Sequence, residues 1–433
     1  MLAHRSKELE NGLQVVTVEQ PHLHSATASL SVRCGSRHEA DTQWGLSHLL
    51  EHMLFRGSKK FPSARALAEV FERSGGSLQA STWRDHTNLS VTMHPSHLRA
   101  VLDALADLVV SPRFEGLEVE RNIVEEELQG DLDEAGQDTD LNNVSRASVW
   151  RGHPMGRRIT GSLESLRAFK LTDVRRHHAN HYVGRNAVLC VAGRVDGLQV
   201  EDLASRVFAP LPAGRRVNDG EAARFAPGSH LHVRPREGSQ VAIQLTFEAL
   251  PDVHPDFPAL NLLSNVLDDG MTSRLQHALC EQRGLVYELS TGLDCYADCG
   301  LYDIEMKVAP RRAATAIAAT FDALQGLCVG GVTAAELEMA RERSLHALEF
   351  RIDSPEELAQ EYAASTLFTG TRPLQEEAAR LQSVTAQDLD RVAKKLFQSG
   401  RVHATLLGPV ERANMRRIEK LLDAFACVKD LRL

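Results

Sequence analysis

The chain has few cysteines for its length, and none of the sequence features that usually accompany export. Its 433 residues include seven cysteines, an odd number, and these are scattered along the sequence. The only close pair, Cys295 and Cys299, flanks a predicted turn between two strands. This pattern excludes the disulfide framework of a small secreted domain and is typical of reduced thiols. The N-terminal residues lack the apolar core and cleavage site of a secretory signal, so we expect a cytoplasmic protein.

The sequence also lacks an excess of positive charge and a long uninterrupted apolar run. It has 49 Lys and Arg residues against 58 Asp and Glu residues, which gives a formal net charge of −9. Such a balance excludes the broad basic surface of most nucleic-acid-binding proteins. The best membrane candidate, residues 313–335, is rich in Ala and Gly and is interrupted by Asp322 and Gln325. We therefore expect a helix and loop of a soluble protein there rather than a membrane span.

What the sequence does contain is a group of potential metal ligands on one predicted helix. Residues 44–55 carry leucines and a methionine at helical spacing, and no Gly or Pro interrupts them after Gly45. Residues three and four apart share a face of a helix, so His48, Glu51 and His52 point into the same space. Two imidazoles could bind one zinc ion there, with a carboxylate beside it. Since a catalytic zinc usually has three protein ligands, one more ligand must come from elsewhere in the chain.

A second predicted helix, residues 117–132, can supply that ligand. Its apolar residues recur at helical spacing, and Glu120 and Glu127, seven residues apart, lie on one face. We select Glu127 as the third ligand. Taken alone, the two histidines could be surface or core residues, and the two glutamates could form the solvated face of a helix. Together they indicate a zinc peptidase site of the inverted type His-x-x-Glu-His, in which Glu51 takes the proton of a zinc-activated water as general base.

The second half of the chain repeats the organisation of the first half without its metal-binding residues. Each half is predicted as a strand, a helix, a hairpin of strands and then two long helices. When the halves are aligned, Asn261, Ser264 and Asn265 stand where the first half has its two histidines and its general base. Ala347 stands in place of the third ligand. This is the pattern expected of a duplicated chain in which only one copy keeps a metal site.

This duplication predicts an α+β fold with two homologous domains. Each domain is expected to be a mixed, mostly antiparallel sheet covered by helices, because neither half shows the strict alternation of strands and helices typical of a parallel fold. The seam falls in a stretch rich in Pro, Gly, Arg and Asp. The predicted domains are residues 1–215, which carry the metal site, and residues 230–433, with a linker at 216–229.

Three stretches of the first half resemble the pitrilysin or insulysin type of inverted-zincin metallopeptidases. They are residues 45–57, 120–128 and 153–156, with Gly161 beyond. The chain is most similar to the short branch of this family that includes mitochondrial processing peptidase and its bacterial homologues. The resemblance implies one zinc ion per chain, held by His48, His52 and Glu127, with Glu51 as the general base and Glu120 as a carboxylate that supports the metal site. It also implies that each chain forms half of a clamshell and that two chains close into a chamber.

The same resemblance implies how a peptide substrate binds. In the family, a strand at the edge of the sheet lies beside the zinc and pairs with the substrate as an added strand, which tolerates many sequences. The matching residues here are Gln79, Ala80 and Ser81. The family usually has Asn where this chain has Gln79, a longer amide that would reach the substrate from a shifted position.

The largest departure from the family lies in the second half. Relatives place an Arg and a Tyr seven residues apart, where both contact the substrate. Tyr287 is present here, but Cys280 occupies the Arg position. A thiol supplies neither the fixed charge nor the donors of a guanidinium, although Arg274 or Arg283 could compensate from another face of the helix. In some relatives the zinc and the Arg/Tyr pair lie on different subunits, so we expect either a homodimer or a heterodimer with a paralogous subunit that supplies this pair.

Two further interpretations follow from these observations. The chain could be a non-catalytic or partner-dependent subunit of a heterodimeric peptidase or an assembly scaffold, an alternative that rests on Cys280. The retained metal ligands favour the catalytic interpretation. Elsewhere, His177, His178 and His181 look rich in metal ligands, but no acidic third ligand stands near them in the sequence. The stretch resembles the helix that the family has before the strand expected at 182–191, so we expect a structural or surface role for these histidines.

Overall fold

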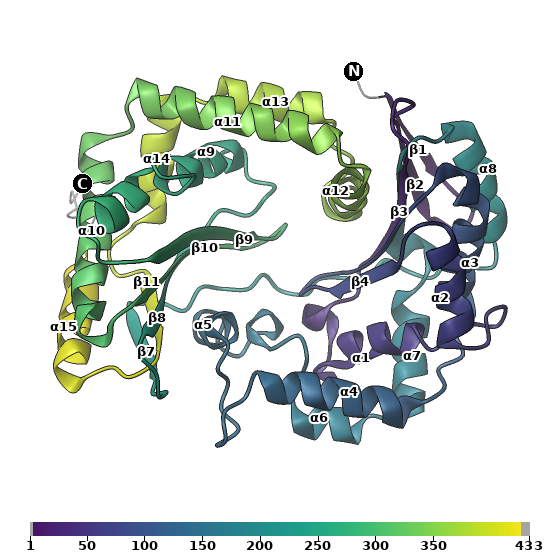
Figure 1. The fold of residues 1–433 in the computed structure, drawn as a ribbon, viewed down its shortest axis with the longest axis horizontal. Coiled ribbons are helices and arrows are strands. Elements are labelled where there is room, and N and C mark those ends of the chain that lie inside the picture. The colour runs from purple at the N-terminus through teal and green to yellow at the C-terminus, as the bar shows by residue number, and fades with distance from the viewer. Residues whose placement is uncertain (1–2, 426–433) are drawn as a thin grey trace. The chain divides into compact units, whose positions relative to one another are not determined.

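The computed structural model describes residues 3–425, which form two compact units (Figure 1). The first unit consists of the chain up to residue 130 together with residues 157–221 and 348–376. The second consists of residues 131–156 and 222–347 and of the chain from residue 377. Each unit therefore includes a segment from the other half of the sequence. The predicted boundaries at 215 and 230 concern the sequence repeats and stay a prediction.

The first unit is built on a six-stranded sheet in the order β1-β2-β6-β3-β5-β4. Only β2 and β6 pair in parallel, and the other neighbours are antiparallel. The strands are β1 (Ala3–Glu8), β2 (Gln14–Glu19), β3 (Ala26–Val32), β4 (Leu78–Thr82), β5 (Thr87–Met93) and β6 (Ala187–Gly193). The helices are α1 (Leu46–Leu54), α2 (Ala64–Arg73), α3 (Leu98–Val110), α4 (Leu117–Gly130), α6 (Leu163–Ala168), α7 (Leu171–His181), α8 (Gly197–Val207) and α12 (Pro355–Phe368).

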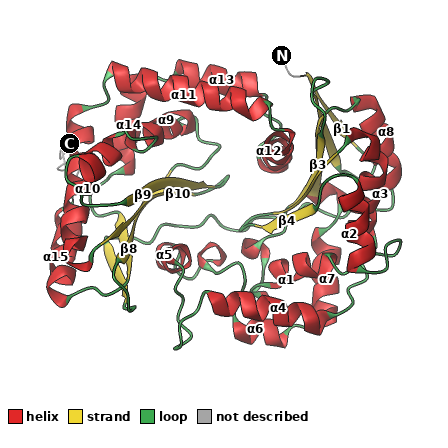
Figure 2. Ribbon diagram, in the orientation of Figure 1, coloured by secondary structure: helices red, strands yellow, loops and turns green. Residues whose placement is uncertain are grey.

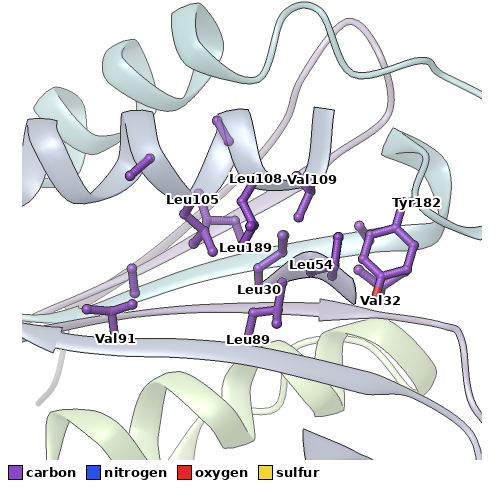
Figure 3. Packing of buried hydrophobic residues seen from close by; sticks show 14 of the residues in the cluster. Leu30, Val32, Leu54, Leu89, Val91, Leu105, Leu108, Val109, Tyr182 and Leu189 are labelled. Atoms are coloured by element: carbon purple, nitrogen blue, oxygen red, sulfur yellow. The ribbon is translucent and has the colours of Figure 1, made fainter. Parts of the chain in front are cut away.

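The apolar core of this unit joins the sheet to helix α3 and includes buried residues of α1, α2, α7 and α8. Leucines and valines of α3 face those of the central strands, as Figure 3 shows for Leu105, Leu108 and Val109 against Leu30, Leu89 and Leu189. Apolar and polar residues alternate along strand β3, and all of them are buried. The apolar set joins the core, while Thr27, Ser29 and Ser31 are completely buried polar residues. Both faces of β3 are therefore covered.

Helix α12 packs against β3, β6 and β5 of the first unit although it lies far along the sequence. Arg33, which follows β3, donates a hydrogen bond to the carbonyl oxygen of Leu367 at 2.8 Å, and its guanidinium lies 4.4 Å from the ring centre of Phe368. Asp219 pairs with Arg33, and its other oxygen lies 2.9 Å from Nε2 of His38. This network fixes the end of α12 to the sheet.

The second unit repeats this architecture (Figure 2). Its sheet has the order β7-β11-β8-β10-β9, which matches β2-β6-β3-β5-β4 element for element, including one parallel pair. The strands are β7 (His230–Arg234), β8 (Val241–Ala249), β9 (Glu288–Cys295), β10 (Gly300–Val308) and β11 (Val402–Leu407). The helices are α5 (Leu141–Val149), α9 (Phe257–Leu267), the π-helical segment η6 (Gln276–Glu281), α10 (Ala313–Gly330), α14 (Ala386–Leu396) and α15 (Arg412–Ala424). Helices α11 (Ala334–Ile352) and α13 (Leu374–Ser383) each contain residues of both units. The predicted α+β fold with two similar sheets is confirmed.

Helix α5 covers the sheet of the second unit as α12 covers that of the first. Arg146 on α5 donates to Asp303 on β10, with Nη2 at 2.6 Å from Oδ2, and its Nε lies 2.8 Å from a carboxylate oxygen of Asp294 on β9. Thr246 on β8 donates to the same Asp303 at 2.6 Å. In the sequence repeat, α5 and α12 occupy corresponding positions, so each half of the chain contributes one covering helix to the other half's sheet.

Three sequence-based expectations about single elements have clear outcomes. The segment from 310 to 330 is long and apolar enough to cross a membrane by length and composition, but 56% of its apolar 18-residue window is buried inside the protein. It forms α10 and packs against α14 and α15 as a core helix. The strand expected at 182–191 begins only at Ala187, because Gly184–Asn186 forms a 3₁₀ turn first. The turn expected between Cys295 and Cys299 is confirmed by the β9–β10 hairpin.

Candidate metal centre

A close backbone contact and a buried carboxylate fix the beginning of α1. Gly45, the residue before the helix, has a φ of +91° in the left-handed region, and a Cβ there would lie 2.6 Å from Cα of Gly161. Only glycine fits at this approach. Glu39 is 4% exposed and accepts hydrogen bonds from the backbone N–H groups of Gly45 and Ser47 at 2.8 and 2.7 Å. A carboxylate at a helix N-terminus satisfies unpaired N–H groups and complements the helix dipole, so α1 starts at a defined place.

His48 and His52 of α1 converge with Glu127 of α4. Nε2 of His48 lies 3.5 Å from one oxygen of Glu127, and Nε2 of His52 lies 3.6 Å from the other. These distances are too long for good hydrogen bonds. They are close to the separation of about 3.4 Å that tetrahedral zinc imposes on ligands bound at 2.0–2.2 Å. The distances between these three side chains therefore suit coordination of a shared cation better than direct hydrogen bonds between them.

Glu120, seven residues before Glu127 on α4, contacts the His52 ring on the side away from Glu127. Its Oε2 lies 3.2 Å from Nδ1 of His52, and its Oε1 lies 3.3 Å from Nη1 of Arg56. An Nδ1–H that donates to this carboxylate leaves the lone pair on Nε2, the atom that faces Glu127. His48 has no equivalent support, because its buried Nδ1 has no hydrogen-bond partner within residues 3–425.

Glu51 lies on the same face of α1, one helical turn after His48. Its Oε2 accepts a hydrogen bond of 2.5 Å from Oγ1 of Thr82, the last residue of β4. Burial raises the pKa of Glu51, and the hydrogen bond from Thr82 opposes that shift. A carboxylate with a raised pKa is a stronger base than an ordinary one, so Glu51 is suited to accept a proton.

The two imidazoles differ in their electrostatic surroundings. Burial lowers the pKa of His48 to about 4, so its ring is neutral and can bind a metal. Burial also lowers the pKa of His52, but the neighbouring Glu127 and Glu51 carboxylates outweigh that effect and bring its pKa above the ordinary value. The His52 ring in turn lowers the pKa of Glu127, which is therefore an anion. The site concentrates negative charge around a space between two imidazoles, and this arrangement favours a divalent cation.

The predicted substrate-binding residues lie on β4, at the edge of the first sheet. Within the described chain β4 pairs only with β5, so its outer edge carries backbone groups without a strand partner. Gln79 and Ser81 are exposed, while Ala80 is half-buried. Nε2 of Gln79 donates to Oγ of Ser77 at 2.7 Å. The strand reaches the candidate metal centre through Thr82, its contact with Glu51.

The other predicted substrate residue belongs to the second unit. Tyr287 precedes β9 and is 91% exposed, and Cys280 lies in η6. Arg274 pairs with Glu336 through both Nε and Nη2, at 2.5 and 2.7 Å, and Nη2 also donates to a backbone oxygen at 2.7 Å. Nε and Nη2 of Arg274 are thus engaged within this unit. The compensation by Arg274 that the sequence suggested stays a prediction.

The corresponding positions of the second unit have lost the metal-binding set. Asn265, which aligns with His52, donates from Nδ2 to Oγ of Ser344 on α11 at 2.8 Å. Ser264 aligns with the proposed base and lies on the same helix, α9. A hydrogen bond between the two helices thus stands where the first unit has its imidazole–carboxylate group.

Sequence reasoning missed three residues that the fold brings to this region. Thr82 and Glu39 contact α1 as described above. Cys34, which follows β3, lies beside His177 and His181 on α7, and one ligand atom from each of these three lies within 4.8 Å of the others. Nε2 of His178 instead lies 2.8 Å from the backbone oxygen of Val109, in a structural contact. The separation of Cys34 from α7 along the sequence gave no signal of their contact.

Comparisons with known proteins agree with this fold and identify the family. Residues 14–162 match the family described as insulinase (peptidase family M16), and residues 168–344 match the peptidase M16 inactive domain. The chain is 30% identical over 417 residues to an uncharacterized zinc protease of Mycobacterium tuberculosis, covering 94% of both chains. It is 25% identical to the beta subunit of the mitochondrial-processing peptidase of Dictyostelium discoideum, covering 93% of this chain and 88% of that one. A solved structure from Pseudomonas fluorescens, described as a peptidase M16 inactive domain, superposes with a TM-score of 0.87 at 20% identity, covering 95% of this chain and 98% of that one.

Proposed function

Because the chain belongs to the M16 peptidase family, we propose that it is a zinc-dependent endopeptidase that cleaves peptides or extended, unfolded segments. The observation that carries this proposal is the convergence of His48, His52 and Glu127 around one space, with Glu51 beside it. The inactive-domain match spans residues 168–344, which include Asn261, Ser264 and Asn265 at the positions aligned with the two histidines and the general base. A family of zinc proteases and an intact ligand set support the same activity independently.

The ligand set supports zinc more than a harder cation. Two imidazole nitrogens and one carboxylate oxygen are the usual protein ligands of a catalytic zinc, which keeps a further position open. Calcium and magnesium prefer oxygen ligands. A bound zinc ion supplies Lewis-acid polarisation of the peptide carbonyl and makes water a stronger acid. We propose one such ion per chain at this centre.

Glu51 acts as the general base and then as the general acid. Its carboxylate takes a proton from the water that attacks the peptide carbonyl, and it returns that proton to the departing amine nitrogen. Thr82 keeps the carboxylate in position through its hydrogen bond to Oε2. Glu120 orients His52 through Nδ1. Glu51, Thr82 and Glu120 each lie on a helix or a strand, so regular backbone structure positions all three side chains.

The free edge of β4 is the proposed binding site for the substrate backbone. A peptide in extended form would pair with Gln79, Ala80 and Ser81 through main-chain hydrogen bonds, because these residues lie at an edge with no strand partner in the described chain. Main-chain pairing requires an extended substrate, which excludes folded helices and favours unfolded segments. Thr82 links this strand directly to the general base, so a peptide paired there lies next to the catalytic groups.

A partner-dependent form of this activity is the second candidate. Cys280 stands where the resemblance implies a substrate-binding arginine, and two nitrogens of Arg274, one possible replacement, already bond Glu336. We propose that a second subunit, either another copy or a paralogue with the missing arginine, completes a dimeric chamber to which Tyr287 also contributes. Full activity of the purified chain alone, with no effect of a change at Cys280, would remove the reason for a paralogous partner.

The catalytic proposal is tested by cleavage of a mixed library of unfolded peptides, with the zinc content of each sample measured in parallel. Glu51→Gln should lower the rate by about 10²–10⁴-fold while the bound zinc is retained, since the amide cannot accept the proton. Glu126→Gln is the matched control, because Glu126 is an exposed glutamate on α4 and should leave the rate unchanged. Wild-type activity in the Glu51→Gln protein would contradict the proposed role. Bound zinc without any cleavage by the wild-type chain would favour the partner-dependent form.

A further inference from the structure

A second group of metal-ligating side chains lies in the core of the first unit. Cys34 follows β3, and His177 and His181 lie one turn apart on α7. Their exposed fractions are 0%, 2% and 7%, so these polar side chains have almost no contact with solvent. Sγ of Cys34 lies 3.3 Å from Nε2 of His177, and the two imidazole rings have centroids 4.1 Å apart. Three ligands from two separate elements thus converge in a buried space.

We propose that Cys34, His177 and His181 form a second metal site, for a thiophilic divalent ion of the zinc type. A thiolate and two imidazoles are ligands that zinc binds well, whereas calcium and magnesium do not prefer them. Zinc bonds of about 2.3 Å to sulfur and 2.0–2.1 Å to nitrogen place these two ligand atoms roughly 3.6 Å apart in a tetrahedron. The Sγ–Nε2 distance of 3.3 Å needs only a small adjustment to reach that value.

Hydrogen bonding prepares His181 as a ligand. Its Nδ1 lies 2.8 Å from the backbone oxygen of His177, and this acceptor requires the proton on Nδ1. The lone pair is therefore on Nε2. A histidine that donates its other N–H to a backbone carbonyl is the usual arrangement in protein metal sites.

Two further groups complete the surroundings of this site. Oγ of Ser47 lies 3.0 Å from Nε2 of His177 and 3.7 Å from Sγ of Cys34, so a hydroxyl lies beside the ligand atoms. The carboxylate of Glu39 is 4% exposed and bonds the backbone of Ser47. A divalent ion with one thiolate keeps one positive charge, which an ionised Glu39 would balance; burial raises the pKa of Glu39 to about 7, and a bound cation would favour its ionised form. Without such balance a buried charge is strongly unfavourable.

Binding at this site replaces a proton by a metal ion. In the metal-free protein, the Cys34 thiol is part of a hydrogen-bonded group with Ser47 and His177. The ion forms a bond to Sγ as the S–H bond breaks, and the proton is released to solvent, one for each ion bound. Because the ligands join the end of β3 to α7, which packs on α1, the ion would hold together the scaffold behind the catalytic helix. The inference does not depend on the proposed peptidase activity.

The test uses the full chain produced in medium where cobalt replaces zinc. Cobalt bound to a thiolate gives a charge-transfer absorption in the near ultraviolet, which the sulfur-free centre at His48, His52 and Glu127 cannot give. We expect close to two cobalt ions per chain and this absorption. Cys34→Ala should lose the absorption and one ion. Cys190→Ala, a change at another completely buried cysteine, should keep both.

Two further measurements separate this site from the catalytic centre and from simple misfolding. Glu127→Gln should lower the metal content but keep the thiolate absorption. X-ray absorption at the zinc edge of the unmodified protein needs no variant, and it should require a sulfur neighbour at about 2.3 Å. Wild-type protein that carries metal without a sulfur neighbour and without the thiolate absorption would overturn the second site, while leaving the catalytic proposal intact.

Discussion

Replacement of Arg146 by methionine should strongly destabilise the second unit. The Arg146 side chain is 5% exposed and pairs with Asp303, which is 6% exposed, and with Asp294, which is 27% exposed. Arg146→Met keeps most of the aliphatic volume but leaves the Asp303 carboxylate buried without its counter-charge. Removal of one partner of a buried pair costs about 3–5 kcal/mol. We expect a loss of that size in the free energy of unfolding of this unit.

Tryptophan fluorescence can follow this loss in the second unit alone. Of the three tryptophans, Trp150 lies beside α5 in the second unit, and the other two, Trp44 and Trp83, lie in the first. A protein in which Trp44 and Trp83 are changed to Phe therefore reports urea-induced unfolding of the second unit, and the shift in midpoint gives the free-energy change. Arg151→Met is the control, because Arg151 is exposed, and it should change stability by less than about 0.5 kcal/mol.

The double change Arg146→Met with Asp303→Leu tests the reason for the loss. If the cost comes from an uncompensated carboxylate, removal of that carboxylate should recover most of the stability. A single variant that loses less than about 1 kcal/mol, or a double variant as unstable as the single one, would refute the reasoning.

Three further changes have defined outcomes in the first unit. Glu120→Gln should weaken zinc binding by about 10–100-fold, measured by competition with a chelator, because His52 loses the carboxylate that orients it. Thr82→Val removes a hydrogen bond to the ionised form of Glu51, so the pKa of Glu51 should rise. The acid limb of the pH profile of kcat/KM should then shift to higher pH by roughly 0.5–1 pH unit. An unchanged acid limb would argue against Glu51 as the titrating base. Asp219 has a pKa of about 2, because its buried ion-pair partners outweigh the effect of burial. A carboxyl group whose pKa is lower in the folded protein than in the unfolded chain, where it is about 3.9, stabilises the fold at pH values above about 3.9. Asp219→Asn should therefore lower the free energy of unfolding by about 2 kcal/mol at neutral pH. In urea titrations, the difference in stability between this variant and wild type should vanish as the pH falls from about 4 to 2.

The elements that carry the catalytic residues could be predicted from the sequence because their signals are local. The helix expected at 44–55 forms α1 at Leu46–Leu54, and the helix expected at 117–132 forms α4 at Leu117–Gly130. Hydrophobic periodicity fixes which residues share a face, so the convergence of His48 and His52 with Glu127 followed from spacing together with the family resemblance. The repeat of the sheet order was predictable for the same reason, since both halves have the same order of elements.

Contacts between distant segments were beyond this reasoning. Ser29 and Ser31 alternate with apolar residues in β3, a pattern typical of a strand with one solvated face, yet both are completely buried. Helix α12, which comes from the other half of the chain, packs against this strand. The same applies to Cys34, whose contact with α7 depends on the tertiary fold and on no sequence spacing. Sequence periodicity reports burial but does not identify the covering element.

The central claim, that zinc at His48, His52 and Glu127 enables Glu51 to catalyse peptide cleavage, is tested most directly by metal removal and return. The chain is stripped of metal with a chelator and titrated with zinc while the cleavage of an unfolded peptide is measured. We predict that activity disappears with the metal and returns in wild type as zinc fills this centre, while Glu51→Gln binds zinc at the same centre without recovering activity. Cleavage that persists in the metal-free chain, or that zinc restores equally in Glu51→Gln, would contradict the account.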